Sequence, residues 1–110
     1  MNWTSISTSA QLDVLKSKSF TDLVIIFKHS TRCSISKLVL SKFEGQLDFD
    51  NGCAFLLDLL SYRSLSNQIS EDYGVKHESP QLLLIKNGEC IAHASHYEIN
   101  QVNPNNYIDV

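Results

Sequence analysis

The residues most able to do chemistry form the phrase F-K-H-S-T-R-C-S-I-S at 27–36. The stretch before it, L-V-I-I-F at 23–27, is apolar and rich in β-branched and aromatic residues, which predicts a strand buried on both faces. Four apolar residues then recur at helical spacing: Ile35, Leu38, Val39 and Phe43. Gly45 is placed to end that helix. We therefore predict that Cys33 lies where a buried strand leads into the start of a helix.

A cysteine at a helix start is favoured as a thiolate. The first N–H groups of a helix lack partners inside it, and the positive end of the helix dipole favours an anion. Arg32 and Lys28 add positive charge nearby, with His29 as a third candidate. The alternative is a small core cysteine without chemistry, but the neighbours of Cys33 are polar on both sides. The position thus predicts a reactive nucleophile.

The composition is that of one domain spanning residues 1–110. The chain has 9 basic and 12 acidic residues, a net charge of −3, and no two adjacent Lys or Arg residues, which argues against a nucleic-acid partner. No signal peptide is evident, and the apolar runs are far shorter than the roughly 20 residues of a membrane helix. Three cysteines at spacings that match no zinc site predict free thiols, no metal and a cytoplasmic location.

The remaining patterns predict alternating helices and strands. They are a helix capped by Thr8 and Gln11, a strand at 53–58, a helix from Tyr62 to Gly74, a hairpin of strands 82–85 and 90–92 around Asn87-Gly88, and a helix opened by Asn103-Pro104. A polar turn at 48–52 follows Gly45. This order predicts an α/β fold, with a mixed four-stranded sheet flanked by helices.

Pro80 stands directly before the predicted hairpin. In this layout the start of the hairpin lies beside the C-terminal end of the first strand, so Pro80 and Cys33 should be neighbours. The loop before Pro80 should then face the thiol. A trans proline would only mark a turn, and the order of the elements favours the rarer cis bond. We predict a cis Ser79–Pro80 bond adjacent to Cys33.

These features together resemble a known family. A Cys-x-x-Ser at a helix start and a later proline before a hairpin resemble the thioredoxin fold. The phrases at 27–36, Y-R-S-L-S-N at 62–67, H-E-S-P-Q at 77–81 and A-S-H at 94–96 resemble the monothiol bacilliredoxins, thioredoxin-like proteins of the bacillithiol system. The resemblance covers about residues 22–98. One departure is Ser34, where members often carry a proline.

The resemblance assigns roles to three residues. Cys33 corresponds to the redox cysteine, Ser36 to the position of the lost second cysteine, and Pro80 to the cis-proline. It implies a monothiol thiol-disulfide oxidoreductase that removes bacillithiol from bacillithiolated client proteins. The Cys33 thiolate would take the bacillithiol and release the client thiol, and a second thiol would then regenerate Cys33. Bacillithiol is a substrate here; no cofactor, nucleic acid or membrane is implied.

Supporting roles follow for residues around these three. Ser36 is either a solvent-facing serine or a hydroxyl donor to the Cys33 thiolate, with Thr31 and Arg32 as further supporting residues. The backbone of Ser79, before Pro80, is placed to hold a client in extended form.

The charged and imidazole groups allow two interpretations each. His29 and His77, expected on loops that meet at the site, either tune its charge or are simply solvated. Glu78 is either a client contact or an exposed carboxylate. Cys53 and Cys90 are expected in the core, away from Cys33.

Other functions are compatible with the same residues. A thioredoxin-fold adaptor would bind clients without turnover, and a glutaredoxin-like enzyme would use another low-molecular-weight thiol such as glutathione. An iron–sulfur carrier of the Cys-Gly-Phe-Ser kind is disfavoured, because Ser34-Ile35 replaces Gly-Phe. The identity of the clients and of the regenerating thiol is not encoded in any motif.

Overall fold

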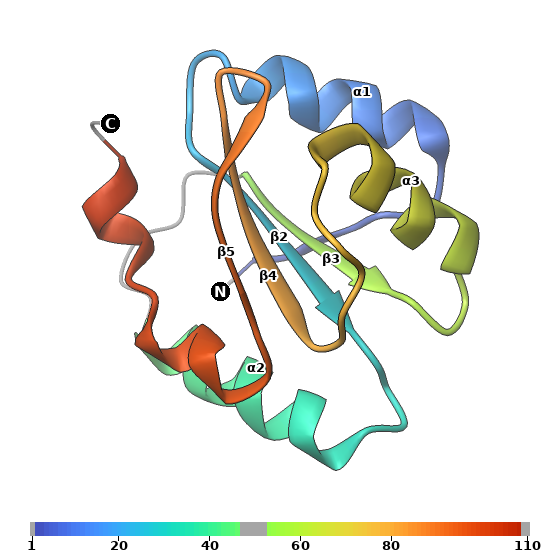
Figure 1. The fold of residues 1–110 in the computed structure, drawn as a ribbon, viewed down its shortest axis with the longest axis vertical. Coiled ribbons are helices and arrows are strands. Elements are labelled where there is room, and N and C mark those ends of the chain that lie inside the picture. Colours follow the sequence, from blue (N-terminus) through green and yellow to red (C-terminus); the bar gives the residue numbers. More distant parts are fainter. Residues whose placement is uncertain (1, 47–52, 109–110) are drawn as a thin grey trace.

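The computed structural model describes residues 2–46 and 53–108, and within them five strands form one mixed sheet (Figure 1). The strands are β1 (Thr4–Ser5), β2 (Val24–His29), β3 (Ala54–Asp58), β4 (Gln81–Lys86) and β5 (Glu89–Ser95). Their order across the sheet is β1-β3-β2-β4-β5. β1, β3 and β2 run parallel, whereas β4 is antiparallel to β2 and β5 is antiparallel to β4. The α/β prediction is confirmed.

The predicted number of strands was wrong by one. β1 has only two residues, Thr4 and Ser5, and both are polar and exposed. Their local sequence therefore carries no strand pattern, and they pair only because β3 offers a free edge about 50 residues later. Nearby, Trp3 packs its ring against Phe27 and Phe43, which fixes the N-terminal segment on the sheet.

Helices cover both faces of the sheet (Figure 1). α1 (Ser9–Lys18) and α3 (Arg63–Tyr73) contribute to one core cluster, while α2 (Ser34–Gln46) and the 3-10 helix η1 (His96–Gln101) contribute to the other. A second 3-10 helix, η2 (Pro104–Tyr107), follows η1. We refer to the two sides as the α3 face and the α2 face.

Side chains of β2 alternate between these two faces. Val24 and Ile26 belong to the α3-face core, and Ile25 and Phe27 to the α2-face core. A strand places successive side chains on opposite faces, so the next two residues, 28 and 29, continue the alternation. They are the last two residues of β2, and they direct polar groups into both sides of the molecule.

β2 and α2 differ in detail from their predicted forms. The apolar run predicted a strand that ends before Lys28, yet β2 continues to His29 and both residues are buried. In α2, Ile35 and Leu38 are exposed instead of facing the core. Gly45 lies inside α2, because the helix continues to Gln46. The predicted turn at 48–52 lies outside the described residues.

Most of the predicted end signals are confirmed. Thr8 and Gln11 form a reciprocal capping box at the start of α1. Gly74 ends α3 with φ 64°, and Asn87 and Gly88 also have positive φ, as a type I′ hairpin turn requires. Asn103 caps η2, which is a 3-10 helix. η1 was not predicted.

Candidate functional site

Cys33 lies directly before α2 and is half-buried. Its carbonyl oxygen accepts the N–H of Lys37 at 3.1 Å, and its own N–H donates to the carbonyl of Ser30 at 3.2 Å. Thr31 and Arg32, which complete this turn, are exposed. The chain therefore holds a partly accessible thiol at the start of a helix, as its sequence predicts.

Ser36 and His29 form a buried polar pair on the α2 face. Ser36 is 0 % exposed, and its Oγ lies 2.6 Å from Nδ1 of His29. The N–H of Ser30 also donates to this oxygen, at 3.1 Å. Burial lowers the pKa of His29, with Asp58 opposing it, so the imidazole is neutral near pH 7.

The hydroxyl of Ser36 bonds two groups. Ser36 Oγ accepts one bond from Ser30, and it either donates its proton to Nδ1 of His29 or accepts a second bond from it, according to the tautomer of the ring. The solvent-facing alternative for Ser36 was wrong, because the residue is buried. His29 is likewise buried at the end of a strand, not solvated on a loop. The pair joins β2 to the first turn of α2.

The Ser79–Pro80 peptide bond is cis, as predicted. β4 pairs with β2 so that Gln81 lies opposite Lys28, which places Pro80 beside the end of β2. The chain passes from that end of β2 to Cys33, and contact between Cys33 and Pro80 stays a prediction. The backbone of Ser79 makes no hydrogen bond with another described residue. Its N–H and C=O can therefore pair with an extended partner.

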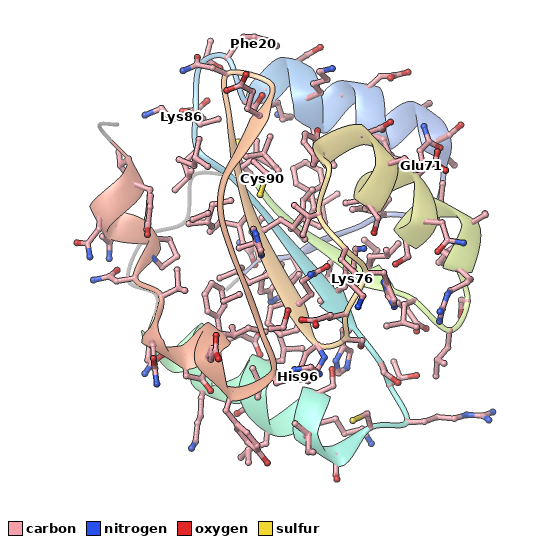
Figure 2. All side chains as sticks on the ribbon, in the orientation of Figure 1. Phe20, Glu71, Lys76, Lys86, Cys90 and His96 are labelled. Atoms are coloured by element: carbon pink, nitrogen blue, oxygen red, sulfur yellow. The ribbon has the colours of Figure 1, made fainter. Side chains whose placement is uncertain are left out.

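The loop at 75–80 is tied to both neighbouring strands. Gln81 Nε2 donates to the carbonyl of Lys76 at 2.9 Å, and the N–H of His96 donates to the carbonyl of Pro80 at 3.0 Å. A hydrogen bond from Ser95 lowers the pKa of Glu78, so this carboxylate stays ionised and bonded to the end of β5. Lys76 and His96 appear at the same end of the sheet (Figure 2).

Lys28 points to the α3 face, which the sequence did not reveal. The side chain is 0 % exposed, and its Nζ lies 3.0 Å from the carbonyl of Ser66, 3.0 Å from Ser70 Oγ and 3.4 Å from His77 Nδ1. Burial, followed by the charge of Arg63, lowers the pKa of Lys28 to about 8. That this charge also acts on Cys33 stays a prediction, and the hydrogen-bond partners of the amine lie on α3 and the 75–80 loop.

His77 belongs to the same cluster. Ser66 Oγ lies 3.0 Å from its Nδ1. Burial lowers the pKa of His77, Lys28 and Arg63 lower it further, and Glu78 opposes them. His29 and His77, which were expected on two loops that meet at the site, thus direct their side chains to opposite faces of the sheet. A signal was available in the sequence, because Ser66 and Ser70 are four residues apart on α3 and so share one side of it.

The other two cysteines lie away from Cys33. Cys53 is buried just before β3, and since β3 is parallel to β2, it lies at the opposite end of the sheet. Cys90 appears toward the hairpin end (Figure 2), and its Sγ donates to the carbonyl of Ala92 at 3.3 Å. Burial raises the pKa of both thiols. Among the described residues, Cys33, Cys53 and Cys90 form no disulfide.

The described residues contain neither a metal-binding cluster nor a membrane-spanning helix. In 2–46 and 53–108, no cluster of three or more His, Cys, Asp or Glu side chains could hold a metal ion. Across the same residues, no helix has the length and apolar character needed to cross a membrane.

Comparisons with known proteins agree with this geometry. The family model described as monothiol bacilliredoxin BrxC matches residues 4–103. A solved structure assigned as an oxidoreductase with a thioredoxin fold is 32% identical, with a TM-score of 0.75, and the match covers 87% of this chain and 84% of that one. Thioredoxin from Schistosoma mansoni superposes with a TM-score of 0.74 at 17% identity, covering 98% and 94% of the two chains. Thioredoxin from Malassezia sympodialis superposes with a TM-score of 0.71 at 17% identity, and the match covers 91% of this chain and 84% of that one.

Proposed function

Because the chain belongs to the monothiol bacilliredoxin family, we propose that it removes bacillithiol from protein mixed disulfides through Cys33. The observation that carries the proposal is the arrangement at the start of α2. There a half-buried thiol precedes the helix, and a buried serine, Ser36, stands where a second thiol would resolve the intermediate. The fold and the family support a thiol oxidoreductase, and the substrate is our proposal.

The reaction is an exchange between sulfur atoms. The Cys33 thiolate attacks the bacillithiol sulfur of the mixed disulfide, forms a new disulfide with it, and releases the client thiolate. A second thiolate then attacks the bacillithiol sulfur on Cys33, leaving as a disulfide with bacillithiol and restoring the Cys33 thiolate. Each step breaks one S–S bond and forms another, so no electron donor besides the second thiol is required.

The protein holds both reactants by its backbone and its helix. The free N–H and C=O of Ser79 support an extended client segment by strand-like hydrogen bonds, which would place its sulfur near Cys33. The start of α2 favours the anionic sulfur of Cys33. Three cysteines that form no disulfide favour a reducing compartment, and we place this activity in the cytoplasm.

The experiment is a transfer measured by mass. A client protein carrying one bacillithiol disulfide is mixed with the reduced protein, and the intact mass of each is followed. We expect the client to lose bacillithiol while Cys33 gains it, and Cys33→Ser to gain none. Cys53→Ser and Cys90→Ser are matched controls that should transfer at the wild-type rate. A client that binds but keeps its adduct would instead identify an adaptor.

A further inference from the structure

The buried amine of Lys28 has a complete set of acceptors. An ammonium carries three N–H donors and accepts nothing. Three groups lie within reach of Nζ: the carbonyl of Ser66, Ser70 Oγ and His77 Nδ1. Ser70 Oγ can accept from Lys28, because its own proton is directed to the carbonyl of Ser66 at 3.3 Å. Each proton of the charged amine thus has one partner.

This count determines which nitrogen of His77 carries the proton. If Nδ1 were protonated, it would oppose an N–H of Lys28, and a buried donor would lose its partner at a cost of about 1–3 kcal/mol. Ser66 Oγ lies 3.0 Å from the same nitrogen, and in that state it shares the single lone pair of Nδ1 with Lys28. The contacts of Lys28 therefore favour Nδ1 as an acceptor, with the proton of the neutral ring on Nε2.

The charges around His77 favour the neutral ring. Lys28 and Arg63 lower the pKa of His77 in addition to its burial, and Glu78 is the one opposing group. The positive groups that act on the ring thus outnumber the negative one. The imidazole does not become a cation in the pH range where an ordinary histidine does, and its Nε2–H donor is kept through neutral pH.

The donor lies on the loop that precedes the cis-proline. His77 is half-buried, two residues before Ser79, and its Nε2 makes no hydrogen bond within residues 2–46 and 53–108. We propose that Lys28 is a positioning residue, which holds His77 as a neutral Nε2–H donor for a carbonyl or carboxylate oxygen of the bound mixed disulfide. The donor role rests on the proposed function, whereas the state of the imidazole does not.

The tautomer can be read directly from nitrogen-15 shifts and long-range couplings of the His77 ring. The measurement uses the Cys33→Ser protein, so that no thiol at the site titrates. At pH 7 we expect a neutral ring protonated on Nε2. A ring protonated on Nδ1, or one that is charged at pH 7, would overturn the proposal.

Lys28→Met removes the donor while keeping an unbranched side chain. We expect the pKa of His77 to rise toward its usual value of about 6.5 and the two tautomers to mix. Lys42→Met, a loss of the same charge on the exposed side of α2, is the matched control and should change neither. An unchanged His77 spectrum in Lys28→Met would contradict the proposal.

A titration of the protein with Lys28 intact tests the same point without a destabilising variant. The pKa of Lys28 is about 8, and the neutral amine no longer requires Nδ1 to accept. We expect the His77 ring resonances to shift with a midpoint near that value. Resonances that stay constant between pH 7 and 9.5 would show that Lys28 does not control the ring.

His77→Phe tests the donor role by kinetics. Loss of one hydrogen bond to the substrate should raise KM for a bacillithiolated client roughly three- to tenfold. The rate at which a small alkylating reagent modifies Cys33 should stay unchanged, because no client is bound. An unchanged KM would refute the donor role. Absence of any exchange by the wild type would refute the proposed function and the donor role together, while the spectra alone decide the control by Lys28.

Discussion

Lys28 and His29 are neighbours in β2, yet their side chains enter opposite faces of the protein. His29 contacts one hydroxyl, that of Ser36, and this pair joins the strand to the start of α2. Lys28 meets three acceptors, drawn from α3 and the 75–80 loop. The α2-face pair therefore holds the helix that presents the nucleophile, whereas the α3-face cluster holds the loop that precedes the cis-proline.

The comparison shows how one strand end can organise two parts of a site. Both polar side chains continue the alternation between the two buried faces that the four apolar residues before them follow. One face tolerates a neutral imidazole, and the other accepts a buried amine, which has the larger burial cost. The two faces should accordingly differ in their dependence on pH and in their sensitivity to loss of a hydroxyl group.

The largest expected effect is a pH dependence of the unfolding free energy that arises from Lys28 on the α3 face. The pKa of Lys28 is 10.5 in the unfolded chain and about 8 in the folded one, so between these values the unfolded state binds more protons. Stability must then rise with pH across this window. The free energy of unfolding of the wild type, minus that of Lys28→Met, should increase by up to about 3 kcal/mol from pH 8 to 10.5. Urea denaturation at several pH values measures it.

Taking the difference in unfolding free energy between the wild type and Lys28→Met cancels the contribution of other groups that titrate in this range. Tyr73, whose pKa is raised to about 12, is one of them. A constant difference between the two proteins would mean that Lys28 is as well solvated as in the unfolded chain.

The second effect concerns the α2-face pair. Ser36→Ala leaves the ring nitrogen of His29 and the N–H of Ser30 without a partner. Each buried group that loses its partner costs about 1–3 kcal/mol, so we expect a loss near 2–3 kcal/mol of unfolding free energy. Urea denaturation at pH 7.5 is the measurement. A loss below about 0.5 kcal/mol, the range of an ordinary surface substitution, would show that the pair is not a buried tie between β2 and α2.

The smallest expected effect is that of a serine-to-alanine substitution on the α3 face, at Ser66. Ser66→Ala removes a hydroxyl from His77 Nδ1, but Lys28 still donates to that nitrogen and still reaches the Ser66 carbonyl. We expect a loss of about 1 kcal/mol, since no buried acceptor is left without a partner. The measurement to compare is the loss of unfolding free energy in Ser36→Ala against the loss in Ser66→Ala, both by urea denaturation. Equal losses would contradict the view that His29 depends on one hydroxyl whereas His77 Nδ1 has two hydrogen-bond partners.

The sequence predicts those parts of the fold that depend on local patterns. The place of Cys33, the end of α3 at Gly74 and the Asn87-Gly88 turn follow from periodicity and backbone preference. The cis Ser79–Pro80 bond followed from the order of the elements combined with the family resemblance.

The parts that the sequence left open depend on distant partners. β1 pairs with a strand about 50 residues away, and its two residues carry no pattern of their own. A lysine after an apolar run is typical of a strand end, and only the acceptors on α3 and the 75–80 loop make the burial of Lys28 possible. For the same reason, the role of Ser36 depended on a partner, His29, whose burial the sequence did not reveal.

The central claim is that Cys33 exchanges bacillithiol without help from another thiol of this chain. Its most direct test loads Cys33 with bacillithiol, removes free thiols, and follows intact mass over time for the wild type and Ser36→Cys. We expect the wild type to keep its adduct. The variant should lose it, because a thiol three residues along the first turn can form an internal disulfide. Loss of the adduct from the wild type at the rate of the variant would mean that Cys53 or Cys90 resolves it, and would contradict the monothiol mechanism.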